Sequence, residues 1–195
     1  MQPNRNAGPL DEIRKSTNVA IFVCQVWAIS MEVFLHRDVG ERYLGPRAAA
    51  VLVLIPLYSL GWQGYDLEPL YWFLGTYFAM CFIARAGIAA RLRRGEHCHS
   101  FYTGWPRFLG PRATVSEISM KRCWEPGILS LLGFAVRDWN APLGTYLILG
   151  AASLAISVGA SEAVERQRTL DMNDAVIDQE QTAERFRAMR GERWQ

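Results

Sequence analysis

Hydrophobic and charged positions are segregated into alternating blocks along the chain. Five stretches are almost free of charged side chains, and charged residues are concentrated between them. The apolar stretches cover 19–35, 48–62, 70–90, 124–139 and 143–160. Long apolar blocks joined by charged links are typical of helices in a lipid bilayer. The pattern predicts an all-α, polytopic membrane protein with a polar N-terminal segment (1–18), a helical membrane domain (19–160) and a charged C-terminal helix (161–195).

The apolar blocks differ in how well they suit a membrane span. Block 70–90 is the clearest candidate, whereas the apolar core of 124–139 is too short to cross ~30 Å of hydrocarbon and predicts a short or re-entrant helix. Block 19–35 is interrupted by Gln25 and Glu32, which share a helical face with His36. This first block is expected to be either an amphipathic or a spanning helix. We therefore expect about four transmembrane helices in all.

The C-terminal region combines a packing face with a charged helix. Ala151, Ala155 and Gly159 repeat at every fourth position and predict a surface for close helix packing. Beyond residue 160 the chain has no proline and is dominated by helix-forming and charged residues. An apolar seam interrupted at Thr169 and Gln179 favours docking on a protein partner over a self-sufficient coiled coil. The seam residues are Met172, Val176, Ala183 and Phe186.

The distribution of arginine and lysine predicts the orientation, and it matters more than the formal net charge of +2. The loop 91–123 is rich in basic residues, whereas the link 61–68 has none, so the loop is expected to be cytoplasmic. Basic and aromatic side chains together predict that this loop binds anionic lipid headgroups at the membrane surface. The residues expected at the lipid interface are Arg91, Arg93, Arg94, Phe101, Tyr102, Trp105, Arg107 and Arg112. The location expected is a bacterial inner (cytoplasmic) membrane.

Ionisable residues within apolar blocks are candidates for function because such groups are costly in lipid without a partner. Glu32 and Arg85 lie at similar depth from the cytoplasmic ends of their blocks, so they could form an intramembrane pair together with Gln25 and His36. A structural alternative is that Arg85 extends to the headgroups while Glu32 binds His36 one helical turn away.

The loop also contains His97, Cys98 and His99, which carry donor atoms for zinc, copper or haem iron. Cys123 or His36 could add a further ligand. The paired ligand spacing of structural zinc sites is missing, so no cofactor is predicted and these residues stay minority metal candidates. The alternative is a solvated loop that faces phosphate headgroups. Because the loop adjoins membrane spans, its aromatic residues favour lipid over nucleic acid.

No Walker loop, dinucleotide-binding motif, zinc-protease motif or nucleophile elbow is present in the sequence. The sequence favours a non-enzymatic membrane subunit with a scaffold or assembly role in a larger complex, such as a secretion or transfer apparatus. Its expected partners are other membrane subunits or further copies of the chain. Two alternatives stay open: a small metal or redox protein that uses residues 97–99, and a channel or transporter subunit built around Glu32 and Arg85.

Overall fold

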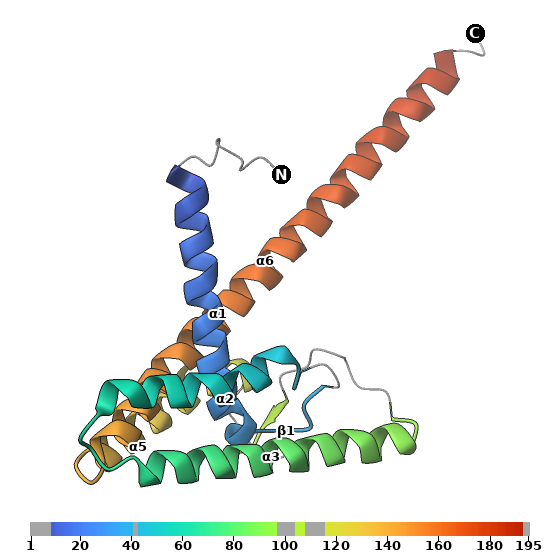
Figure 1. The fold of residues 1–195 in the computed structure, drawn as a ribbon. Coiled ribbons are helices and arrows are strands. Elements are labelled where there is room, and N and C mark those ends of the chain that lie inside the picture. Colours follow the sequence, from blue (N-terminus) through green and yellow to red (C-terminus); the bar gives the residue numbers. More distant parts are fainter. Residues whose placement is uncertain (1–8, 41–42, 97–103, 108–115, 193–195) are drawn as a thin grey trace, which may run out of the picture. The chain divides into compact units, whose positions relative to one another are not determined.

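A computed structural model describes residues 9–40, 43–96, 104–107 and 116–192, and within these the side chains of 16–190. Helices dominate this part of the chain, so the all-α prediction is confirmed (Figure 1). The five longer helices are α1 (Pro9–Leu35), α2 (Pro46–Ser59), α3 (Glu68–Arg93), α5 (Glu125–Arg137) and α6 (Ala141–Glu192). The shorter elements are β1 (His36–Arg37), the 3-10 turn η1 (Leu60–Trp62), β2 (Trp105–Pro106), α4 (Glu117–Ser119) and the π-helical turn η2 (Met120–Trp124).

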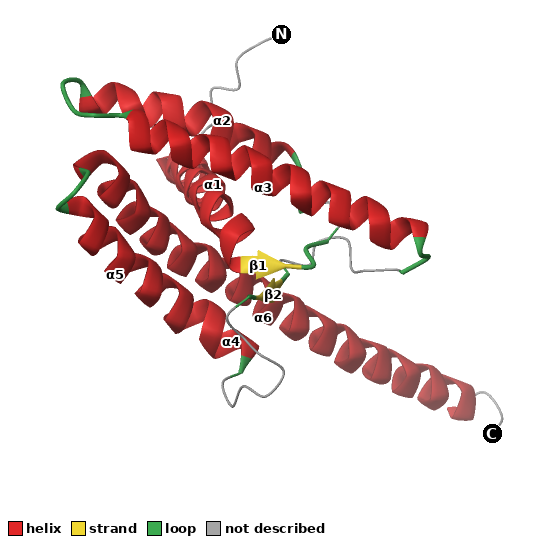
Figure 2. Ribbon diagram, turned by 90° about the horizontal axis from the view of Figure 1, so that it is seen from below, coloured by secondary structure: helices red, strands yellow, loops and turns green. Residues whose placement is uncertain are grey.

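The C-terminal half of α1 forms the centre of the core. It lies between two antiparallel hairpins, α2–α3 on one side and α5 with the first half of α6 on the other (Figure 2). The Trp27 indole donates to the carbonyl of Tyr146 at 3.1 Å, and the Tyr146 hydroxyl lies 3.0 Å from that of Ser30. These aromatic and polar contacts fix α1 against α6, since a buried polar group needs a hydrogen-bond partner.

Glycines allow the helices of the core to approach each other closely. A Cβ atom on Gly144 would overlap the backbone of Arg137 in α5, and one on Gly150 would lie 2.7 Å from the terminal methyl of Met31 in α1. Both distances are shorter than ordinary carbon–carbon contacts of about 3.5–4.0 Å. A methyl group therefore does not fit at Gly144, where backbone fills the space, and at Gly150 it would require the Met31 side chain to move.

A two-residue antiparallel strand pair connects the distant chain segment at Trp105 to the end of α1. His36 pairs with Pro106 and Arg37 with Trp105. Gly104 precedes this pair with a φ of +94°, and a Cβ there would lie 2.7 Å from the Arg37 carbonyl oxygen. Glycine suits this position because other residues rarely adopt positive φ and the space is filled by backbone.

Among the described residues, three helices are long and apolar enough to cross a membrane, and these candidate spans are Ser16–Leu35, Glu68–Arg93 and Ala141–Arg190. The helix Pro46–Trp62 is apolar but shorter. Large apolar side chains on α2, α3 and α5 point away from the core; Phe82 and Leu131 are each 72% exposed and Trp72 is 69% exposed. Scattered exposed apolar residues are ordinary, but whole helix faces of them indicate contact with lipid or another protein.

Residues from Gly159 onward form a second unit, which consists of the remainder of α6. Its side chains are exposed almost throughout, including large apolar ones. Helix α6 is unbroken from Ala141 to Glu192, so block 143–160 and the charged segment after it share one helix.

The structure also differs from the sequence prediction at several element boundaries. The segment 1–18 was predicted as polar and separate, but α1 already begins at Pro9. The predicted loop 91–123 contains the last turn of α3, strand β2 and the helical turns from Glu117 to Trp124. Hydropathy locates apolar blocks, but it does not locate helical turns in polar sequence, where capping and tertiary contacts decide.

Candidate site: a buried polar centre and a basic pocket

His36 lies at the junction of α1 and β1, where the chain leaves the core. Its Nε2 atom lies 2.9 Å from Oε2 of Glu125, and the side chains are 3% and 0% exposed. A single proton shared between Nε2 and the carboxylate oxygen is enough for this hydrogen bond. If the imidazole ring carried a second proton, the contact would be an ion pair. The bond connects α1 to the start of α5 across 89 positions of sequence.

Glu125 occupies an unusual place in the helical structure. It directly follows the five-residue π-helical turn η2 and begins α5, with Pro126 as the next residue. Single π-helical turns are uncommon and often occur at functional sites. Glu125 is not among the site residues predicted from the sequence. A carboxylate beside an apolar block gives no sequence signal of its buried partner 89 positions away.

Glu32 lies one helical turn before His36 and is only 5% exposed. Its charged neighbours are His36, Glu125, Lys121 and Arg47. The Lys121 ammonium donates to the Gly104 carbonyl at 2.8 Å and to a carboxylate oxygen of Glu117 at 2.7 Å. We call Glu32, His36, Lys121 and Glu125 the polar centre.

Two carboxylates of the polar centre, Glu32 and Glu125, are buried near each other. Within the polar centre, Nδ1 of His36 and Oε1 of Glu125 are buried without a hydrogen-bond partner. Among the described residues, no group of three histidine, cysteine or acidic side chains could hold a metal ion.

The predicted pair between Glu32 and Arg85 is not formed. The Arg85 guanidinium instead donates to the carbonyl of Leu44. Glu32 has His36 and Glu125 as its neighbours. Gln25 is half-buried two turns before Glu32 on α1, about 10 Å along the helix axis. The structure thus brings Glu32 and His36 together and leaves Arg85 and Gln25 apart from them.

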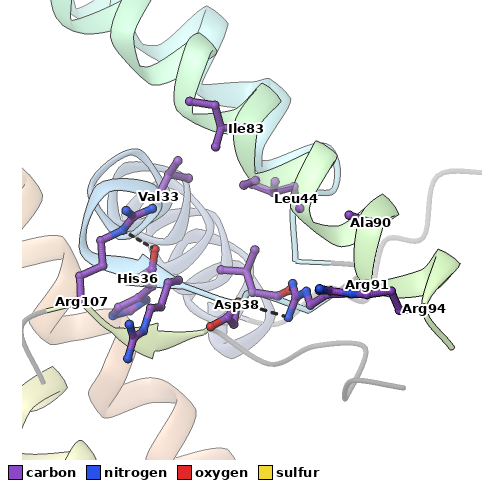
Figure 3. A pocket seen from close by; sticks show the side chains of 13 residues that line it. Val33, His36, Asp38, Leu44, Ile83, Ala90, Arg91, Arg94 and Arg107 are labelled. Carbon is purple, nitrogen blue, oxygen red and sulfur yellow. Dashed lines mark hydrogen bonds and ion pairs between the residues drawn. The ribbon is translucent and has the colours of Figure 1, made fainter. Parts of the chain in front are cut away.

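A basic pocket of about 250 Å³ lies beside the polar centre, where the end of α1, strand β1 and the last turns of α3 meet (Figure 3). His36 is common to the polar centre and the pocket. The charged lining residues are Arg37, Asp38, Arg91, Arg94 and Arg107, and the apolar ones include Val33, Leu44 and Ile83. Four arginines against one aspartate make this pocket strongly cationic.

The structure describes some of the residues predicted at the lipid interface, and only part of these line the basic pocket. Arg91, Arg94 and Arg107 line the basic pocket, whereas Arg93 does not. Trp105 is half-buried in β2. The remaining positions, Phe101, Tyr102 and Arg112, lie outside the described residues, as do the metal candidates His97, Cys98 and His99.

The predicted packing and docking residues lie on α6. Ala151 is buried in the core, while Ala155 and Gly159 are exposed. In the second unit, Met172, Val176, Ala183 and Phe186 are all exposed. Among the described residues, Ala151 is therefore the one member of the small-residue repeat that is buried.

Comparison of the chain with protein-family models, curated proteins and solved structures finds no match.

Proposed function

We propose that this protein is a non-enzymatic integral membrane subunit with a scaffold or assembly role in a larger membrane complex. The observation that carries the proposal is the apolar outer surface of α2, α3 and α5, where large side chains such as Phe82 and Leu131 are mostly exposed. A surface of this kind is stable only when lipid or another protein covers it, because exposing apolar area to water costs about 25 cal/mol per Å².

The crossing of α1 and α3 favours one topology. Figure 1 shows α1 from the side, steeply across α2 and α3, and Figure 2 shows it nearly end-on. Transmembrane helices tilt by only about 20° on average, so α1 and α3 do not both cross one bilayer along its normal. We assign α3 as the span and α1 as a helix that enters at a shallow angle. This keeps Arg14 and Lys15 on the cytoplasmic side with the basic loop 91–123.

The second unit supports a role in assembly. Among its exposed apolar residues, Met172, Val176 and Phe186 recur on one side of α6, whereas Leu170 and Ile177 lie on the other side. An amphipathic helix of this type can lay its apolar face into a groove of a partner. The proposed occupant is a helix of another subunit of the same membrane complex.

A scaffold role is also favoured over the channel alternative. Arg85 lines a pocket of about 180 Å³ with Tyr77 and Cys81, and neither Glu32 nor Gln25 belongs to the lining of that pocket. The channel hypothesis requires these polar residues to share one pathway. The metal or redox alternative rests on residues 97–99, outside the described part of the chain, and metal analysis of purified protein would test it.

Site-specific photo-crosslinking tests the docking of the second unit. A photoreactive amino acid at Val176 should crosslink to a defined membrane subunit in intact cells, because this position lies on the apolar side of α6. The same amino acid at Gln181 is the matched control, since its position is exposed on the opposite side of the helix. Equal crosslinking from both positions, or none from Val176, would contradict docking through the apolar side.

A further inference from the structure

Two arginines of the basic pocket, Arg91 and Arg107, are held by backbone carbonyls of one segment, residues 35–39. The Arg107 Nε atom donates to the His36 carbonyl at 2.9 Å, and the Arg107 backbone N–H donates to the Leu35 carbonyl at 2.8 Å. From α3, the Arg91 guanidinium donates to the Val39 carbonyl at 2.7 Å. Cationic groups fixed before binding lose less conformational entropy when a ligand arrives.

Basic side chains outnumber acidic ones in the lining of the pocket. Arg37 forms no ion pair with any described side chain. The Arg94–Glu96 pair is 3.1 Å long but exposed on both sides, so it contributes little. Asp38 lies 3.8 Å from Arg91 and is the only acidic residue of the lining. In Figure 3, Arg107 lies at one end of the pocket and Arg91 and Arg94 at the other.

The apolar side of the pocket faces the outer surface of α3. Ile83, Ala84 and Gly87 line it, and Ile83 is 60% exposed next to Phe82. A pocket of about 250 Å³ is smaller than the roughly 300–1,000 Å³ typical of sites for drug-sized molecules. It therefore fits a charged group at the end of a longer apolar molecule better than it fits a whole ligand of that size.

We propose that the basic pocket binds the headgroup of an anionic membrane lipid, with its phosphate bound by arginines of the lining and an acyl chain along α3 near Ile83. Arginine suits this ligand because its planar guanidinium can donate two parallel hydrogen bonds to phosphate oxygens. Basic pockets at the cytoplasmic ends of membrane helices bind such headgroups. The inference rests on the membrane location in the proposed function, and α3 ends at Arg93, where headgroups would lie.

Calorimetric titration of the purified full-length protein in a neutral detergent tests this site. The probes are dihexanoyl phosphatidylglycerol, dihexanoyl phosphatidylcholine and inorganic phosphate. The anionic lipid should bind at least tenfold more tightly than the other two, because it alone combines net negative charge with acyl chains. The double variant Arg37→Gln/Arg94→Gln should weaken its binding roughly tenfold or more, since each basic residue near a headgroup contributes substantially.

Arg93→Gln is the matched control, because Arg93 ends the same helix but does not line the pocket. It should change the affinity less than twofold. An equal loss in Arg93→Gln, or equal binding of the zwitterionic lipid, would overturn the site. Equally tight binding of inorganic phosphate would overturn its assignment to a lipid. The crosslinking experiment at Val176 does not depend on this pocket. A negative result in the lipid titration can therefore be told apart from failure of the proposed function.

Discussion

Glu125→Leu is expected to lower the free energy of unfolding by about 3 kcal/mol or more. The substitution leaves the buried Nε2 of His36 without its partner, and loss of one member of a buried polar pair typically costs 3–5 kcal/mol. The double variant His36→Leu/Glu125→Leu should recover much of this loss, because neither polar group then remains unpaired. Unfolding by SDS in mixed micelles, followed by circular dichroism, measures both effects.

Glu68→Leu provides a matched control. Glu68 also begins a helix and also precedes a proline, but it is exposed, where its carboxylate accepts a hydrogen bond from the Trp72 indole at 3.2 Å. Its replacement should change stability by about 0.5 kcal/mol or less, as is usual for surface positions. If Glu125→Leu had an equally small effect, the pair with His36 would not contribute to the fold.

The second large effect is expected from Gly144→Ala, which should destabilise the protein by about 2–3 kcal/mol. A Cβ atom there would overlap the backbone of Arg137, and backbone cannot rotate away as a flexible side chain can. Overpacking of a tight contact costs typically 1–3 kcal/mol. The substitution should therefore separate α5 from α6 locally, which the same SDS titration would detect.

Gly159→Ala is the control for helix propensity. It lies on the same helix, and nothing lies within 4 Å of where its Cβ would be. Alanine in a helix is favoured over glycine by roughly 0.5–1 kcal/mol, so this variant should be neutral or slightly stabilising. A stabilising Gly144→Ala would contradict the close approach of α5 and α6.

Much of the helical architecture was predictable from the distribution of apolar residues. The blocks 70–90 and 143–160 correspond to α3 and the first part of α6, because long runs without charge leave few alternatives to a helix. The strand pair at His36–Arg37 was not predictable. It has two residues on each side and depends on a glycine at position 104 that fits against a distant backbone.

The candidate site was predictable in part. Glu32 and His36 stood out because polar groups in an apolar block need partners, and the structure brings them together. The predicted pair of Arg85 and Glu32 rested only on their similar distance from the cytoplasmic ends of their apolar blocks. That distance does not specify which face of α3 points inward. Glu125 was missed because its partner is remote in sequence, and long-range contacts follow from tertiary packing rather than from local pattern.

The most direct test of the central claim is the mass of the native particle. The protein should be extracted with its surrounding lipid from the cells that produce it, without detergent, and weighed by native mass spectrometry. A membrane subunit of a larger complex should be found in particles of fixed stoichiometry that contain other subunits in addition to the 22.1 kDa chain. Particles that contain a single 22.1 kDa chain and no other protein would contradict the proposal.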